Sequence, residues 1–182
     1  MNLPALNQAS RYTYNDYLSW DESYRYELIE GVAYALASPN QSHQRVLRKL
    51  SNSIDNFLKD KQCELFISPS DVKLAETTVV QPDLFVVCDK AKLDGQFTNG
   101  APDLVIEILS KTTIQKDRVL KYNLYLKAKV KEYWIVDPDN KIVEVLTLTD
   151  NKFVHNAYSE NDEISSTVIK GYVINMADVF NE

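Results

Sequence analysis

The chain has 182 residues, of which 45% are hydrophobic and 25% charged, as expected for one soluble globular domain spanning residues 1–182. No stretch is apolar over the length that a membrane helix needs, and the N-terminus has neither a charged leader nor an apolar signal core. The composition therefore argues against a membrane protein and predicts a cytoplasmic one.

The formal net charge of −6 disfavours a nucleic-acid partner at first sight, because phosphate binding depends on lysine and arginine. The charge is unevenly distributed, however. Residues 111–131 carry seven basic side chains and one acidic side chain, so this segment is +6 and the remainder sums to −12. Such a run is most often a solvated helix face, and the alternative is a surface that binds a polyanion.

The first part of the chain predicts a short helix, a hairpin and a long helix. Thr13 or Asn15 could cap the short helix, which extends toward Trp20. Two short apolar runs within residues 24–36 are divided by a Glu-Gly pair, a pattern that indicates a hairpin. Apolar side chains at helical spacing then predict a long helix over residues 42–60.

Four strands are predicted next, at residues 63–67, 71–74, 83–88 and 103–109. The last two are separated by a long polar segment that contains glycine, and such a loop is more often functional or mobile than structural. Cys63 and Cys88 lie beside or within apolar runs without metal-binding spacing, which favours buried thiols over a disulfide.

A second long helix follows Thr113 and has apolar residues along it. The C-terminal part then predicts a strand hairpin at residues 131–137 and 142–148. One or two edge strands follow around residues 153–158 and 167–173, and then a short helix capped near Asn175. The fold class predicted from this order is α/β, specifically an α+β mixed sheet with flanking helices.

One apolar run stands out because it contains a carboxylate. A Pro-Asp pair introduces the run Leu104–Leu109, which is typical of a strand covered on both faces, and Glu107 lies inside it. Burying a carboxylate without a partner is costly. A second Pro-Asp pair places Asp83 at the start of an earlier strand. Antiparallel pairing of the two strands would set Asp83 opposite Glu107.

Two convergent carboxylates form an oxygen site that suits Mg²⁺ or Mn²⁺, which can activate water and stabilise charge on a phosphoryl group. Lys121 is the best-placed cation, because it lies on the helix after the Glu107 strand and shares a side of it with Asp117 and Tyr125. Each residue has a structural alternative. Asp83 could cap a turn, Glu107 could be a buried ion-pair partner, and Lys121 could be a solvated surface lysine.

Other catalytic classes find less support in the sequence. The patterns GxxxxGK[ST], GxGxxG and HExxH are absent, and four glycines leave little scope for a phosphate-binding loop. Ser110 lacks the glycine elbow of a nucleophilic hydrolase, and the two histidines are His43 and His155.

A set of residues resembles the signature of the Uma-two family of endonucleases, which is counted within the PD-(D/E)XK, restriction-endonuclease-like superfamily. The matching segments span most of the chain and are Tyr26–Gly31, His43, Pro82-Asp83, Glu107–Ser110, Asp117, Lys121, Tyr125 and Glu132–Pro138. The resemblance implies a restriction-endonuclease-like core with extra N-terminal strands and magnesium-dependent cleavage of DNA.

The resemblance also implies roles for individual residues. Asp83 and Glu107 would be the metal ligands, Lys121 the catalytic lysine, and Glu27 and His43 accessory residues. The structural alternatives are a paired strand glutamate for Glu27 and a helix cap or surface partner for His43. The superfamily motif has its lysine two residues after the glutamate, where this chain has a leucine, so the lysine function is expected on the helix.

The sequence therefore predicts a metal-dependent endonuclease acting on DNA, with the basic segment 111–131 holding the phosphate backbone. One rival is a catalytically inactive dimeric module that binds nucleic acid or protein on the same fold. Another is an enzyme acting on a small phosphorylated molecule. A homodimer is expected because a small nuclease must reach two strands to cut a duplex.

Overall fold

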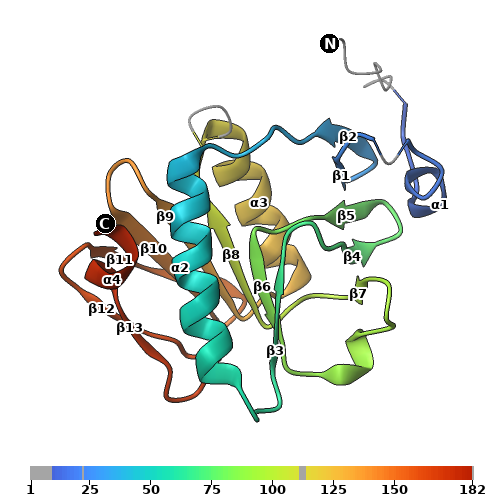
Figure 1. Ribbon diagram of the computed structural model, residues 1–182. Helices are drawn as coiled ribbons and strands as arrows, with labels where there is room; N and C mark the ends of the chain where they lie inside the picture. The colour runs from blue at the N-terminus through green and yellow to red at the C-terminus, as the bar shows by residue number, and fades with distance from the viewer. Residues whose placement is uncertain (1–9, 22, 111–113, 182) are drawn as a thin grey trace.

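The computed structural model describes residues 10–21, 23–110 and 114–181, with the backbone alone described at 114–117. A six-stranded sheet of order β11-β10-β9-β8-β6-β3 lies at its centre (Figure 1). Its strands are β3 (Glu64–Ile67), β6 (Leu84–Val87), β8 (Leu104–Ile108), β9 (Glu132–Asp137), β10 (Ile142–Thr149) and β11 (Lys152–Ser159). β8 and β9 are parallel and the other neighbours are antiparallel, so the predicted mixed sheet is confirmed.

Two long helices cover the two faces of this sheet, α2 (Gln41–Leu58) on one side and α3 (Ile114–Ala128) on the other (Figure 1). Side chains alternate along each strand, so Leu84 and Ile106 pack in the core under α2. Phe85 and Val105 point the other way and pack with residues of α3. The unbroken apolar runs therefore mark strands that are covered on both faces, as predicted.

A second sheet carries the N-terminal strands, in the order β2-β1-β5-β4-β7. Its strands are β1 (Tyr26–Ile29), β2 (Val32–Ala35), β4 (Val72–Ala75), β5 (Thr78–Val80) and β7 (Thr98–Asn99), with a 3-10 turn η1 (Lys90–Lys92) before β7. The predicted β1–β2 hairpin is present, and Glu30 and Gly31 at its turn have φ values of 48° and 80°. The short helix α1 (Tyr14–Tyr17) begins at a Thr13 cap, one of the two predicted cap residues.

The first long helix and the last strand were predicted with different accuracy. Helix α2 begins one residue earlier than predicted, because the side chain of Asn40 caps it by accepting a hydrogen bond from the backbone N–H of His43 (2.9 Å). The strand predicted over residues 167–173 is wrong. The Ser166 hydroxyl accepts hydrogen bonds from the backbone N–H groups of Val168 (3.2 Å) and Ile169 (2.9 Å), and the chain turns there.

The C-terminal segment instead forms a small hairpin and a final helix. β12 (Glu163–Ser165) pairs with β13 (Val173–Asn175), and α4 (Met176–Phe180) follows with the predicted cap at Asn175. No helix in the described part of the chain is long and apolar enough to cross a membrane.

Glu132 ties this C-terminal segment to the central sheet. Its side chain is fully buried, and its Oε1 accepts a hydrogen bond from Trp134 Nε1 (2.7 Å). Its Oε2 accepts hydrogen bonds from both the backbone N–H (2.6 Å) and the hydroxyl of Thr167. Glu132 belongs to the sequence signature that carries the family resemblance, and here these contacts hold the fold together.

Cys63 and Cys88 form a disulfide bond, so the prediction of buried thiols is wrong. The register of β3 and β6 explains the pairing. Glu64 pairs with Val87, and the next position along both strands sets Cys63 directly opposite Cys88. Because the pairing depends on the register of two strands, the spacing of the cysteines alone could not reveal it.

Candidate active site

The register of β6 and β8 sets Asp83 opposite Glu107. Leu84 pairs with Ile106, so one further position along this antiparallel ladder sets Asp83 opposite Glu107. The Glu107 carboxylate contacts side chains of α3, and the Asp83 carboxylate contacts His43 of α2. The backbone N–H of Ile108 donates a hydrogen bond to Asp83 Oδ2 (2.8 Å) and fixes that carboxylate at the end of the strand. The antiparallel pairing of the two strands that follow the Pro-Asp pairs is therefore present, as expected.

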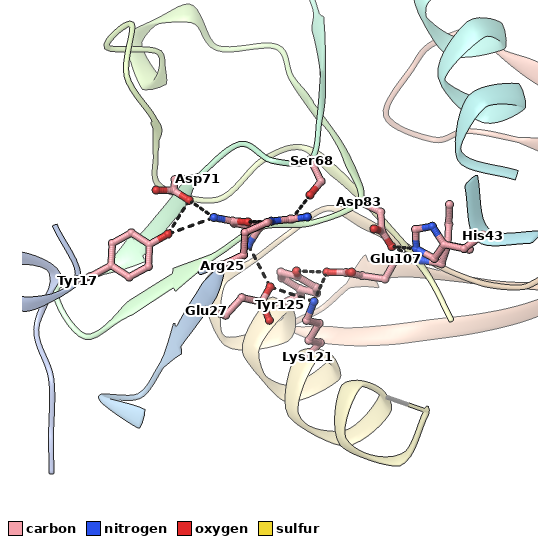
Figure 2. A network of polar contacts seen from close by, with 12 residues as sticks. Tyr17, Arg25, Glu27, His43, Ser68, Asp71, Asp83, Glu107, Lys121 and Tyr125 are labelled. Carbon is pink, nitrogen blue, oxygen red and sulfur yellow. Dashed lines mark hydrogen bonds and ion pairs between the residues drawn. The ribbon is translucent and has the colours of Figure 1, made fainter. Parts of the chain in front are cut away.

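Helix α3 brings Lys121 and Tyr125 to Glu107, as Figure 2 shows. The ammonium Nζ of Lys121 lies 2.9 Å from Glu107 Oε1 and 3.1 Å from Glu27 Oε1. The Tyr125 hydroxyl, one helical turn further along, donates to the same Glu107 oxygen (2.6 Å). Lys121 is only 4% exposed, which rules out a solvated surface lysine.

Glu27 and His43 complete the same cluster from β1 and α2. Glu27 is 3% exposed and accepts a hydrogen bond from the backbone N–H of Gln81 (3.0 Å). His43 is 5% exposed, and its Nε2 lies 3.0 Å from Asp83 Oδ2. Its Nδ1 is buried and has no hydrogen-bond partner among the described residues. His43 is thus a buried partner of Asp83, and the surface alternative is wrong.

The five residues singled out from the sequence therefore come together at one place. A cavity of about 110 Å³, here called the catalytic cavity, is lined by His43, Asp83, Glu107 and Lys121, together with neighbouring polar residues. Glu27 lies behind Lys121 and contacts it directly.

Burial dominates the electrostatics of this cluster. It is the largest cause of the raised pKa of Glu107, which is about 8, and the negative charges of Asp83 and Glu27 also contribute to the increase. The Lys121 ammonium and the Tyr125 hydroxyl oppose this increase. Burial and the nearby Glu107 also raise the pKa of Tyr125, which keeps its hydroxyl protonated as a donor. Two carboxyl groups, those of Glu27 and Glu107, thus contact one ammonium group in a poorly solvated site, with Asp83 nearby.

The donor set fits a divalent cation. The contacts above use Oδ2 of Asp83 and Oε1 of Glu107, and the second oxygen of each carboxylate takes part in none of them. A cation would also offset the excess negative charge. Within the described ranges, no three His, Cys, Asp or Glu side chains are arranged to hold a metal ion. Mg²⁺ accepts few protein ligands and keeps several waters, so two carboxylates are compatible with it.

The raised pKa of Glu107 predicts how the stability of the metal-free protein depends on pH. Between about pH 5 and 8 the folded state holds a proton on Glu107 that the unfolded state has released, so the free energy of unfolding should fall as pH rises. This group contributes a slope of at most about 1.4 kcal/mol per pH unit. Urea denaturation in EDTA at several pH values should show the fall in the wild type and a flatter profile in Glu107→Gln. Parallel profiles for the two proteins would contradict it.

A polar network that the sequence analysis missed extends the site away from α2 (Figure 2). Arg25 donates hydrogen bonds to Gln81 Oε1 (3.0 Å) and to the Ser68 hydroxyl. Gln81 Nε2 donates to Asp71 Oδ1 (2.9 Å) and to the Tyr17 hydroxyl (3.2 Å), which itself donates to Asp71 (2.9 Å). The one feature of the sequence that could have indicated this network is the position of Gln81, directly before the first Pro-Asp pair.

The basic segment 111–131 does not form a free cationic surface where it is described. Four of its side chains outside the catalytic cavity have partners from other parts of the chain: Arg118 with Glu144, Lys127 with Glu30, Lys129 with Asn151, and Lys131 with Asp103. Lys111 lies outside the described residues, and the Lys116 side chain is not described either. The expectation that this segment holds a phosphate backbone is therefore unsupported by the described side chains.

The fold and the paired carboxylates define a restriction-endonuclease-like α+β protein. A solved structure described as "a putative nuclease belonging to DUF820" from Anabaena variabilis has the same fold, with a TM-score of 0.80 at 19% identity, covering 93% of this chain and 97% of that one. Residues 14–177 match the Uma2 family, described as "Putative restriction endonuclease". The chain belongs to this family, which confirms the resemblance seen in the sequence.

Two relatives from Synechocystis sp. are similar to this chain. "Uncharacterized protein slr1290" is 28% identical over 141 residues, which cover 75% of this chain and 74% of the relative. "Uncharacterized protein sll1609" is 28% identical over 115 residues, which cover 61% of this chain and 65% of the relative.

Proposed function

We propose that this protein is a metal-dependent endonuclease that hydrolyses phosphodiester bonds in DNA. The observation that carries the proposal is the cross-strand pair Asp83 and Glu107 with the Lys121 ammonium 2.9 Å from Glu107. Membership of a family described as "Putative restriction endonuclease" and a fold shared with a nuclease-like structure support it.

Each residue of the cluster has a role in this proposal. Asp83 and Glu107 would hold Mg²⁺ through their second oxygens, and a bound cation supplies Lewis acidity and lowers the pKa of water. Lys121 would neutralise charge on the phosphoryl oxygens or orient the attacking water. In hydrolysis, water forms the new P–O bond, the P–O bond to the leaving oxygen breaks, and that oxygen gains a proton. Glu27 positions Lys121, and His43 positions Asp83.

Helix α2 provides a path for the phosphate backbone. A groove of about 570 Å³, here called the α2 groove, is lined by Arg45 and Arg48, and it meets the catalytic cavity at Gln44 and Leu47, which line both. Both arginines are exposed and lie one helical turn apart, and their guanidinium groups have no ion pair or hydrogen bond with the described residues. Free guanidinium groups of this kind bind phosphates well.

Reversing the charge of the α2 groove should weaken DNA binding. The double variant Arg45→Glu/Arg48→Glu is expected to lower the affinity at least about tenfold. The slope of log affinity against log salt concentration should fall by the amount expected for the loss of about two phosphate contacts. Fluorescence anisotropy in EDTA, at about 50 to 200 mM salt, measures both quantities. Lys152→Glu/Lys170→Glu is the matched control, because it changes the charge equally at exposed positions. An equal loss of affinity in the control would contradict a specific path along α2.

The simplest test of the function is metal-dependent cleavage. Purified protein is incubated with single-stranded DNA, with plasmid and with linear duplex DNA, in each case with Mg²⁺, with Mn²⁺ and with EDTA. Cleavage is expected with either metal and should stop in EDTA. Cleavage of small phosphodiesters that is insensitive to salt would indicate a small phosphorylated substrate instead, because binding of a polyanion weakens steeply with salt.

A further inference from the structure

A third hollow lies on the other side of the catalytic cavity from α2. It has a volume of about 440 Å³, within the range of small-molecule sites, and is here called the aromatic cavity. Four aromatic side chains line it: Tyr17, Trp20, Tyr24 and Tyr26. Trp20 packs edge-on against Tyr17 (5.3 Å between ring centroids) and Tyr26 (5.4 Å), so these rings support one another.

The aromatic cavity borders the catalytic cavity and shares two lining side chains with it. Arg25 and Gln81 line both. The α2 groove shares Gln44 and Leu47 with the catalytic cavity, so the cavity that is lined by Asp83 and Glu107 borders both other hollows. Figure 2 shows the corresponding polar residues in this order, from Tyr17 through Arg25 and Glu107 to His43.

The chemistry of the lining favours a planar, uncharged ligand with hydrogen-bonding groups. Asp21 and Asp71 line the cavity and would repel a phosphate, while the Arg25 guanidinium is already engaged by Gln81 and Ser68. Tyr26 also lines the cavity, and its buried hydroxyl has no hydrogen-bond partner within the described part of the chain. Aromatic rings beside carboxylate acceptors match the flat faces and amino groups of nucleobases.

We propose that the aromatic cavity binds a nucleobase of the substrate strand, next to the phosphodiester bond held at Asp83 and Glu107. Naming the ligand as part of a DNA strand rests on the proposed nuclease function. A base stacked in this cavity cannot remain paired in a duplex. The substrate is therefore single-stranded or locally unpaired DNA, whose phosphates continue along the α2 groove.

The test compares two labelled single strands of equal length, one with its bases and one with an abasic sugar-phosphate backbone. Affinities are measured by fluorescence anisotropy in EDTA, so no cleavage takes place. The wild type should bind the strand with bases at least about fivefold more tightly, because stacking of one base on an aromatic side chain contributes at least this factor. Tyr24→Ala should reduce the ratio of the two affinities toward one, and Tyr24→Phe should keep the ratio of the wild type.

Tyr24 is suited to this test because it is only half-buried and its ring packs against no other aromatic ring in the described part of the chain. Tyr158→Ala, which removes a half-buried tyrosine from β11, is the matched control and should keep the preference. Arg45→Glu/Arg48→Glu should weaken both strands and leave their ratio unchanged. Thermal unfolding of each variant confirms that it is folded.

Three results would overturn the inference: equal wild-type affinity for the two strands, no binding of either strand, or an unchanged preference in folded Tyr24→Ala. Cleavage with Mg²⁺ is measured separately on the same proteins. Cleavage without a base preference refutes the aromatic cavity as a base site and leaves the nuclease proposal standing. A base preference that Tyr24→Ala abolishes, without cleavage, refutes the nuclease and leaves the base site standing.

Discussion

Replacing Asp83 with asparagine should lower the rate of Mg²⁺-dependent DNA cleavage by at least about a hundredfold. The amide keeps the size of the side chain and can still accept the hydrogen bond from the Ile108 backbone, so the fold should remain. The lost negative charge is the one that would hold the metal. The stabilisation of the wild type by added Mg²⁺ should disappear with it, because a ligand stabilises only the state that binds it.

The measurement combines initial cleavage rates at saturating Mg²⁺ with thermal unfolding during a Mg²⁺ titration. Asp55→Asn is the matched control, since it makes the same change at an exposed position on α2 and should leave both readouts unchanged. Full activity in Asp83→Asn would refute the proposed metal site. If the wild type shows neither cleavage nor a thermal shift, the catalytically inactive binding module becomes the better explanation.

Lys121→Met should both abolish cleavage and destabilise the metal-free protein by about 3–5 kcal/mol, the usual result of removing one partner from a buried ion pair. Lys121 offsets the charge of Glu27 at 3.1 Å and, above the Glu107 pKa of about 8, also that of Glu107 at 2.9 Å, and it is almost fully buried. Methionine fills a similar volume without charge. The two glutamates would then remain buried beside each other without that ammonium.

A second substitution separates the structural role of Lys121 from its catalytic role. Adding Glu27→Gln to Lys121→Met removes one of the uncompensated charges and should recover part of the lost stability, but no activity. Urea denaturation in EDTA gives the free energies, and plasmid cleavage gives the activity. A Lys121→Met protein that still cuts DNA would exclude a catalytic role for the lysine. Unchanged stability would show that the ion pair is worth little in the fold.

The central site was predictable because local periodicity determines where its side chains lie. Strand alternation places Glu107 on the face opposite Ile106, and antiparallel pairing of two similar runs places Asp83 beside it. Helical spacing sets Lys121 and Tyr125 on one side of α3. Glu27 and His43 came from the family resemblance alone, since no local pattern links them to a metal site.

Features that depend on contacts between distant segments were not predictable from the sequence. The count of positive charges over residues 111–131 suggested a free basic surface, yet Arg118 and Lys127 have partners on β10 and at the β1–β2 turn. The Cys63–Cys88 disulfide required the register of β3 and β6. The strands β5 and β7 have three and two residues, too few for a periodic pattern.

The buried Glu132 carboxylate makes the C-terminal hairpin part of the core. Both hydrogen bonds to its Oε2 come from Thr167, which lies between β12 and β13. A buried carboxylate that no described cation neutralises depends on every such donor, since each one offsets part of its lost hydration. Deleting the chain from Thr167 onward would therefore leave an unsatisfied charge at the start of β9, the parallel neighbour of the strand that carries Glu107. The integrity of the candidate active site thus depends on residues at the far end of the chain that never contact it.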